Sequence, residues 1–125
     1  MILDTGAISA WADGQSGIQH LLATTQRLVL PVIALGEYLF GILQSRERSR
    51  YEAWLTANLP TVEIAVVGRQ TAREYAEIRL ELKQRGAPIP VNDTWIAALA
   101  RQHQLPILSK DTHFDRVPGI QRLGW

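Results

Sequence analysis

The chain has 125 residues, of which 46% are hydrophobic and 20% charged, and it contains no cysteine. A chain of this length and apolar content buries enough surface to fold without a disulfide or a structural metal. The absence of cysteine excludes disulfide scaffolds and zinc sites built on thiolates, and the apolar content excludes a disordered chain. The formal net charge of +1 argues against a protein that coats nucleic acid by bulk electrostatics, because such domains are strongly basic. We expect one domain, residues 1–125.

No segment has the pattern of a signal peptide or of a membrane span. Asp4 and Asp13 interrupt the apolar start of the chain. The most apolar stretch, Leu28–Leu43, is short and is broken by Pro31 and Glu37, so we expect it to be buried core. With no cysteine that would indicate an oxidising compartment, we expect a cytoplasmic location.

Short apolar strands alternate with helices along the first half of the chain. Apolar runs predict strands at 1–3 and 28–30, and helical spacing of apolar residues predicts helices around 8–12, 16–26, 31–43 and 46–58. Pro31 is expected to begin the third of these helices, Ser45 to cap the fourth and Pro60 to end it. The helix at 31–43 is apolar on more than one face, so it is expected to be buried on both sides.

The second half continues the alternation. Strands are expected at 62–67, 106–108 and 119–123, and a long helix between Gly68 and Gly86. A rigid loop, Ala87–Pro90, leads to a helix that opens at Asn92-Asp93 and is expected to bury Trp95, Ile96, Leu99 and Ala100. This order predicts an α/β fold, a three-layer α/β/α sandwich with a short, mostly parallel central sheet. Ligands of such folds bind outside the carboxyl ends of the strands.

Three aspartates stand where that site is expected. Asp4 and Asp111 follow predicted strands, and Asp93 stands at a helix start. Each has a simple structural explanation, since an acid at a helix N-terminus caps amides and complements the macrodipole by about 0.3–1 kcal/mol.

Glu37 favours a functional explanation. It is the only charged residue between Leu28 and Leu43, and its helical neighbours are apolar or glycine. A buried carboxylate needs a proton, a cationic partner or a metal. Four converging acids are most simply reconciled by a divalent cation, and oxygen ligands indicate Mg²⁺ or Mn²⁺. The three histidines, His20, His103 and His113, lack the spacing of a zinc hydrolase.

Four segments together resemble a known family. They are Leu3-Asp4-Thr5, Val32–Gly41 (VIALGEYLFG), Val91–Ala98 (VNDTWIAA) and Leu108–Phe114 (LSKDTHF). In this order they resemble the four motifs of the PIN domain, and more narrowly those of the VapC-type ribonuclease toxins of prokaryotic toxin–antitoxin pairs. The resemblance covers the whole chain. One departure is Gly6, where many members carry a polar residue.

The resemblance implies a PIN fold in which Asp4, Glu37, Asp93 and Asp111 gather around Mg²⁺ or Mn²⁺ and hydrolyse RNA, either transfer or ribosomal. Hydroxyls of Thr5 and Ser109 would position a water or a phosphate, and Asn92 would support the site beside Asp93. Asp115 is either a fifth, outer acid or a turn residue. The resemblance also implies a homodimer and a VapB-like antitoxin that lies in an apolar groove and reaches the acids with an arginine.

Other interpretations stay open at this point. Phosphate contacts are expected from Arg46, Arg48, Arg50 and Lys110, although mixed arginine and glutamate is also typical of a solvated helix face. A PIN-fold binding module with little catalysis is the main alternative, with its partner on the third and fourth predicted helices. A dehalogenase-type hydrolase would need an acid at Gly6, and a receiver domain would leave Glu37 unexplained. Without the four acids the net charge of +1 becomes +5, which suits a nuclease with a basic surface around an acidic pocket.

Overall fold

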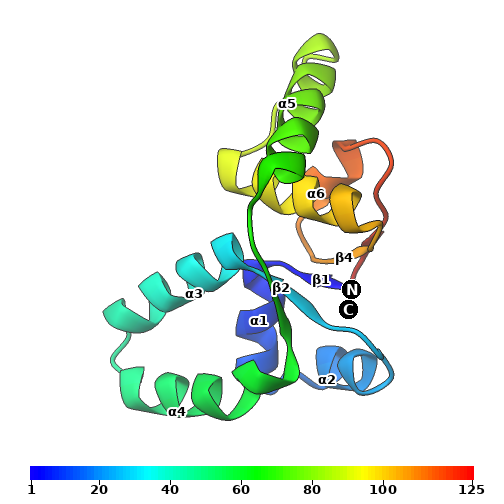
Figure 1. The fold of residues 1–125 in the computed structure, drawn as a ribbon. Coiled ribbons are helices and arrows are strands. Elements are labelled where there is room, and N and C mark those ends of the chain that lie inside the picture. Colours follow the sequence, from blue (N-terminus) through cyan, green and yellow to red (C-terminus); the bar gives the residue numbers. More distant parts are fainter.

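A parallel sheet with helices on both faces forms the centre of the protein (Figure 1). The computed structural model describes all residues, 1–125. In sheet order the five strands are β3 (Glu63–Ala65), β2 (Val29–Pro31), β1 (Ile2–Leu3), β4 (Ile107–Leu108) and β5 (Arg122–Leu123). Every neighbouring pair is parallel. The predicted three-layer α/β/α fold is confirmed, with a sheet that is parallel throughout.

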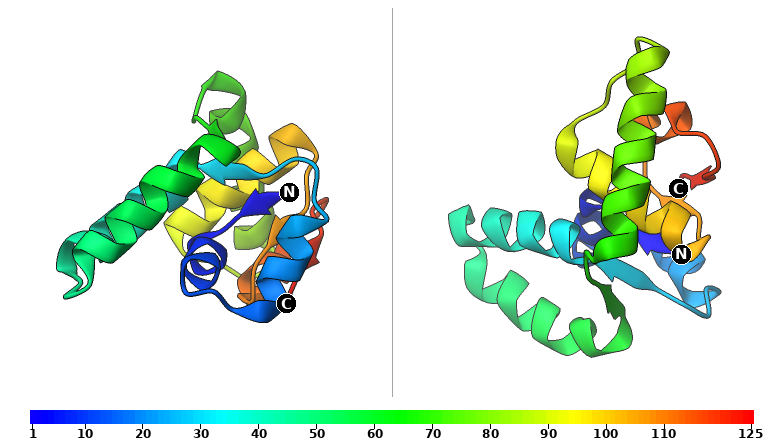
Figure 2. Two further views of the ribbon diagram at one scale, coloured as in Figure 1. Left: turned by 90° about the horizontal axis from the view of Figure 1, so that it is seen from below. Right: turned by 45° about the horizontal axis from the view of Figure 1, so that its top comes forward.

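The helices divide between the two faces of the sheet and a projecting hairpin (Figures 1 and 2). They are α1 (Thr5–Ala12), α2 (Ser16–Ala23), α3 (Val32–Gln44), α4 (Arg48–Asn58), α5 (Arg69–Gln84) and α6 (Val91–His103), with 3₁₀ turns η1 (Leu59–Thr61) and η2 (Thr112–Arg116). The pair α5 and α6 covers one face, α1 and α2 lie on the other, and α3 and α4 extend away from the sheet. None of the helices is both long enough and apolar enough to cross a membrane.

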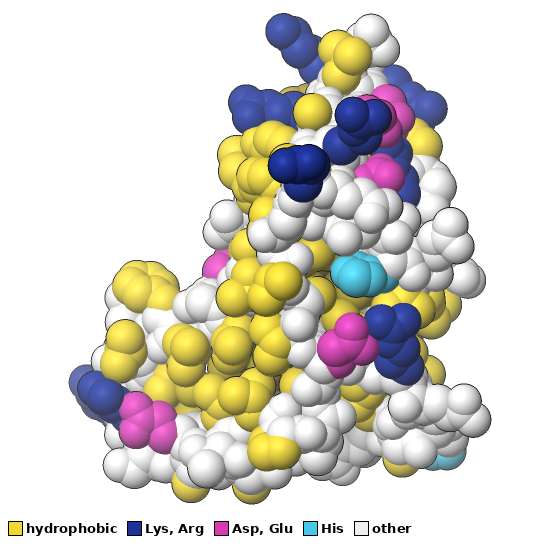
Figure 3. Space-filling view, viewed as in Figure 1, with side chains coloured by type: hydrophobic (Ala, Val, Ile, Leu, Met, Phe, Trp, Pro, Cys, Tyr) yellow, Lys and Arg dark blue, Asp and Glu magenta, His cyan; other side chains and the backbone are white.

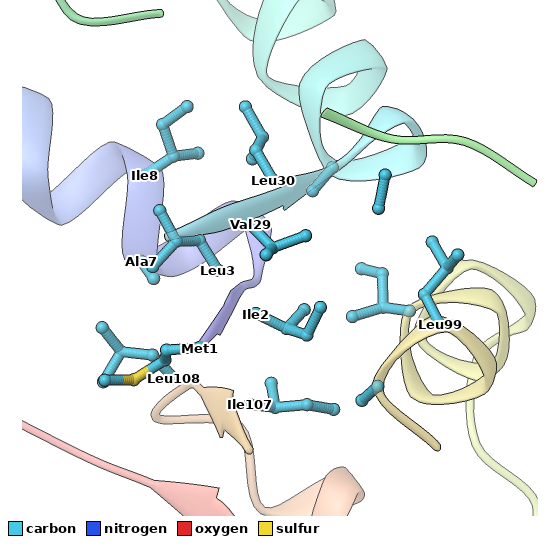
Figure 4. Close-up of a cluster of buried hydrophobic side chains, with 14 of the residues drawn as sticks. Met1, Ile2, Leu3, Ala7, Ile8, Val29, Leu30, Leu99, Ile107 and Leu108 are labelled. Carbon is cyan, nitrogen blue, oxygen red and sulfur yellow. The ribbon is translucent and has the colours of Figure 1, made fainter. Parts of the chain in front are cut away.

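The core follows from the alternation of side chains along the short strands (Figure 4). Ile2, Val29 and Ile107 are paired in register and fully buried, and they point toward α6. Leu99 of α6 packs on that side of the sheet. Leu3, the next residue of β1, points toward α1. Both faces of the sheet are therefore apolar, which explains why the strands appear in the sequence as continuous apolar runs.

The strand order places a crevice beside β1. After β1 the chain passes through α1 and α2 to reach β2 on one side of it, and it later returns from α6 to β4 on the other side. The connections therefore diverge between β1 and β4, and the carboxyl ends of parallel strands at such a point form a binding crevice. Asp4 follows β1 and Asp111 lies three residues after β4, so both acids lie at this point.

Some predicted boundaries are wrong by a few residues. Pro31 is the last residue of β2 and the N-cap of α3, whose first helical residue is Val32. Ser45 is the C-cap of α3, and its Oγ accepts a hydrogen bond from the Glu47 amide at 3.0 Å, so α4 begins at Arg48. In this arrangement Ser45 orders the turn between the two helices and does not cap the second one.

Other elements are shorter than predicted. The helix expected to 26 ends at Ala23, and the strand expected at 62–67 is confined to Glu63–Ala65, with Val66 and Val67 exposed. The strand expected at 119–123 is confined to Arg122–Leu123. Trp95, predicted to be buried, is only partly buried, and its ring stacks on Tyr75 of α5 with ring centroids 3.9 Å apart.

The prediction that α3 is buried on both sides is wrong. Tyr38 and Ile42 are buried, whereas Phe40 and Leu43 on the opposite face are 62% and 58% exposed. Figure 3 shows apolar side chains gathered over the α3 and α4 hairpin. An apolar stripe of this kind marks a surface for another molecule more often than a solvated face.

Arg101 joins α5, α6 and the C-terminal segment. Its side chain is only 17% exposed. The guanidinium donates to Glu74 and Glu81 of α5 at 2.8 Å each and to the Pro118 carbonyl at 3.3 Å. Glu77 lies 3.6 Å away as a third carboxylate partner. A partly buried arginine among carboxylates is costly to lose, because the carboxylates remain behind without a partner.

We predict that Arg101→Met lowers the free energy of unfolding by about 2–4 kcal/mol, because it leaves Glu74 and Glu81 without their cation. Arg48→Met is the matched control. It removes an exposed i,i+4 pair with Glu52 and is expected to change the same quantity by less than about 0.5 kcal/mol. Urea unfolding followed by circular dichroism measures both, and equal effects would contradict this role of Arg101.

Candidate active site

An open cleft of about 570 Å³ lies at the carboxyl ends of the strands. It is lined by all four acids from the sequence motifs, which are Asp4, Glu37, Asp93 and Asp111. Four different elements supply them: the turn after β1, helix α3, the first turn of α6, and the loop after β4. Segments far apart in the sequence therefore bring their carboxylates to one place.

Asp4 is the most buried of the four, at 8% exposed. Its Oδ1 accepts a hydrogen bond from the Ala7 amide at 2.7 Å and so caps α1. Its Oδ2 accepts a hydrogen bond from the hydroxyl of the fully buried Ser109. The Ser109 oxygen in turn accepts from the Asp111 amide at 2.9 Å. This chain of bonds ties the end of β1 to the loop after β4.

Glu37 reaches the cleft from α3 and is held by Thr5. The Thr5 hydroxyl donates to Glu37 Oε1 at 3.0 Å, which links α3 to the first residue of α1. Glu37 is partly buried and has no cationic partner within 4 Å. The two hydroxyl residues that the resemblance singled out, Thr5 and Ser109, thus each hold one acid.

Asp93 and Asp111 form a second group together with His113. The imidazole Nδ1 lies 3.3 Å from Asp93 Oδ2 and 3.0 Å from Asp111 Oδ1. The His113 backbone amide also donates to Asp111 Oδ1, at 2.9 Å. One donor atom from each of the three side chains lies within 4.8 Å of the others, close enough for all three to hold one metal ion.

The environment of the cleft disfavours the ionised form of two of its carboxyl groups, those of Asp4 and Asp93. Burial raises the pKa of Asp4, and the charges of Asp93 and Asp111 raise it further, against the bonds from Ser109 and Ala7, which lower it. Burial also raises the pKa of Asp93, and Asp111 and Glu37 add to that, whereas His113 opposes it. A divalent cation would relieve this repulsion, and carboxylate oxygens are the ligands that hard cations prefer. The donor set therefore fits a divalent metal.

Lys110 is the one cationic side chain that lines the cleft. Its Nζ lies 4.7 Å from the centre of the Trp125 ring, which also lines the cleft. Gly6 lies beside Asp4, and a side chain there would begin 3.5 Å from Asp4 Oδ1. Glycine at this position therefore leaves the cleft open next to its most buried acid. Asn92 is exposed on the first turn of α6 and is not among the lining residues.

The three predicted phosphate-binding arginines lie outside the cleft. Arg48 pairs with Glu52 at 2.7 Å, and Arg46 is exposed in the turn before α4. Arg50 lies 3.8 Å from Asp13, which lines the cleft, so Arg50 is close to the rim. Asp115, the candidate fifth acid, is engaged by Arg122 at 2.8 and 2.9 Å and does not line the cleft.

His113 is a site residue that sequence spacing does not indicate. No metal-binding spacing surrounds it, yet the short turn η2 carries it back over Asp93 and Asp111. The available signal was its place two residues after Asp111 and directly before Phe114. Phe114 is 1% exposed and anchors the turn in the core, and the preceding side chain lies beside Asp93 and Asp111.

Known proteins resemble this chain over most of its length. The family model of the PIN domain matches residues 1–120. Ribonuclease VapC5 of Mycobacterium tuberculosis is 30% identical over 121 residues, which cover 94% of this chain and 87% of that protein. A tRNA(fMet)-specific endonuclease VapC of Salmonella typhimurium is 28% identical over 102 residues, which cover 81% of this chain and 77% of that protein.

A solved structure shares the fold over nearly the whole chain. It is VapBC-5 of Mycobacterium tuberculosis, a member of the VapBC family of toxin–antitoxin systems, and it superimposes with a TM-score of 0.78 at 25% identity, covering 99% of this chain and 97% of that one. The sequence resemblance is thereby confirmed. The chain belongs to the PIN-domain family and, within it, to the VapC group.

Proposed function

We propose that the protein is a metal-dependent endoribonuclease that hydrolyses phosphodiester bonds in RNA. The observation that carries this proposal is the convergence of four carboxylates, from four separate elements, in one open cleft with a lysine at its edge. The names of two relatives, a ribonuclease and a tRNA-specific endonuclease, support it. A PIN-fold binding module is the alternative, but binding alone would not explain why four mutually repelling acids line one cleft.

In this proposal Asp4, Glu37, Asp93 and Asp111 hold Mg²⁺ or Mn²⁺, directly or through water. Such an ion, when bound, neutralises phosphate charge and makes water a better nucleophile at neutral pH. The protein's own part is orientation. Ser109 fixes one oxygen of Asp4, and Thr5 fixes one oxygen of Glu37, so neither carboxylate has to be ordered when substrate arrives.

The substrate class we propose is transfer RNA, at an unpaired segment. Sequence-specific proteins recognise RNA mainly in loops, where bases are accessible, and an open cleft suits a flexible strand. Lys110 is the side chain best placed to contact a phosphate there, and Arg50 is close to the rim through Asp13. Support for transfer RNA comes from the tRNA(fMet)-specific relative.

A groove beside the cleft suits a VapB-like antitoxin. It has a volume of about 320 Å³, is lined by Tyr38, Ile42 and Tyr51, and shares Thr5 and Glu37 with the acidic cleft. The Tyr38 hydroxyl is buried there without a hydrogen-bond partner. We propose that an antitoxin segment fills this groove, satisfies that hydroxyl and continues toward the acids. The related VapBC-5 toxin–antitoxin structure supports such a partner.

The outer face of α3 suits a second copy of the chain. This stripe, formed by Val32, Leu39, Phe40 and Leu43, is 39%, 40%, 62% and 58% exposed, and it lies opposite the groove face of the helix. It contains no charged side chain, so two copies meet around a two-fold axis without like-charge repulsion. We propose a homodimer through this face.

We predict that Asp4→Asn reduces metal-dependent RNA cleavage at least about 100-fold, because an amide is a poor metal ligand and cannot carry the negative charge that the site needs. The circular dichroism spectrum is expected to be unchanged. The assay is cleavage of total RNA and of purified transfer RNA in Mg²⁺ or Mn²⁺, with EDTA as the metal-free reference and mapping of fragment ends.

Asp115→Asn is the matched control, because it neutralises an aspartate outside the cleft and is expected to keep full activity. Undiminished cleavage by Asp4→Asn would sink the proposed site. No metal-dependent product from the wild-type protein on any RNA would favour the binding module.

We predict that, in EDTA at pH 7, Asp93→Asn melts at a higher temperature than the wild type. Folding raises the pKa of Asp93 above its ordinary value of 3.8, mainly through burial, so ionisation favours the unfolded chain. The contribution of this group to stability therefore falls as pH rises from about 3.8 through the raised pKa. The advantage of the variant should be absent near pH 3 and should grow as the pH rises above about 3.8. A lower melting temperature for the variant at pH 7 would show that the ionised carboxylate of Asp93 does not destabilise the fold.

We predict that Phe40→Asp converts the protein from dimer to monomer at micromolar concentration, because it places a charge at the centre of the outer face of α3. Light scattering coupled to size exclusion measures the mass. Ala53→Asp, at an exposed position of α4, controls for the added charge and should remain dimeric. A monomeric wild type would contradict the proposed interface.

A further inference from the structure

We infer that His113 is a nitrogen ligand of the metal site and gives it a preference for transition ions such as Mn²⁺ and Co²⁺ over Mg²⁺. This inference rests on the proposed metal-dependent function and adds to it a specific ligand outside the four acids. Its basis is the position of the imidazole between two of the carboxylates that face the cleft.

The separations match those of ligands on a single ion. With metal–ligand distances of about 2.1 Å, neighbouring donor atoms on an octahedral ion lie about 3.0 Å apart. His113 Nδ1 is 3.0 Å from Asp111 Oδ1 and 3.3 Å from Asp93 Oδ2. The imidazole nitrogen therefore lies at the spacing of an adjacent ligand from each of the two acids, and all three donor atoms lie within 4.8 Å of one another.

The position of His113 is fixed by its own turn. Its backbone amide donates to Asp111 Oδ1, and the next residue, Phe114, is buried in the core. The imidazole itself is 37% exposed, so the ring can turn its Nδ1 lone pair toward an ion without disturbing the core. A residue that is anchored by its backbone, with its ring beside two acids, is well suited to act as a ligand.

The chemistry of the donor then decides which ion binds. Mg²⁺ strongly prefers oxygen ligands and water, whereas the affinity of mixed nitrogen and oxygen sites rises from Mn²⁺ through Co²⁺ along the first transition row. A site of four carboxylates alone would show little of this rise. One imidazole among them adds binding energy for the transition ions and little for Mg²⁺.

The test measures metal binding and does not depend on RNA cleavage. Isothermal titration of the full chain gives Co²⁺ and Mg²⁺ affinities for the wild type, His113→Ala and His113→Asn. Loss of the ligand is expected to weaken Co²⁺ binding about 10–100-fold and Mg²⁺ binding less than about 3-fold in both variants. Pulsed electron paramagnetic resonance of Mn²⁺ bound to the wild type should show the ¹⁴N coupling of a coordinated imidazole. His20→Ala, at an exposed position of α2, is the control and should change neither.

The outcomes separate this inference from the proposed function. A wild type that binds Mn²⁺ and cleaves RNA, but shows no ¹⁴N coupling, overturns the role of His113 alone. Full Co²⁺ affinity in His113→Asn also overturns it, because the asparagine amide keeps a hydrogen bond to Asp111 but is a poor ligand. Absence of any divalent binding overturns both. The wild-type spectrum decides the question even if a variant fails to fold.

Discussion

The bond between Ser109 and the buried carboxylate of Asp4 is the contact around which the site is built. It crosses from the loop after β4 to the end of β1, the two neighbouring strands at which the connections of the sheet diverge. The other oxygen of Asp4 caps α1, and the Ser109 oxygen receives the Asp111 amide. One carboxylate thus sets the start of α1, the loop after β4 and the position of a second acid.

That arrangement has a cost in stability. Burial and neighbouring acids raise the pKa of both Asp4 and Asp93, so the metal-free protein carries a cleft that favours protonation. A site that is unfavourable when empty binds a divalent cation more strongly, since the ion removes the repulsion as it binds. The near-neutral net charge of the chain conceals a cleft that is lined by five acids and one lysine.

The fold and the location of the four acids could be predicted because both depend on local patterns. Apolar runs mark Ile2 and Ile107 as parts of buried strands, and the acids follow motifs in chain order. Local patterns do not say what covers a surface. The apolar face of α3 that carries Phe40 has the same periodicity as a core face, and only the packed structure shows it to be exposed.

Details that depend on tertiary contacts could not be predicted from the sequence for the same reason. Ser45 suits an N-cap by type, yet it closes α3, and Trp95 is apolar but is held partly exposed against Tyr75. His113 contacts the acids of the cleft only because η2 folds back over Asp93, a contact across 20 residues. Spacing rules for metal sites describe ligands on one helix or loop, and they do not recognise ligands that the fold assembles.

The central claim is that Asp4, Glu37, Asp93 and Asp111 together hold a divalent cation. Crystals of the protein grown in Mn²⁺, with an anomalous difference map recorded at the manganese absorption edge, test it most directly. If the four acids hold the ion, the map shows a strong peak within coordination distance of carboxylate oxygens in this cleft. A protein saturated with Mn²⁺ whose cleft shows no peak would contradict it.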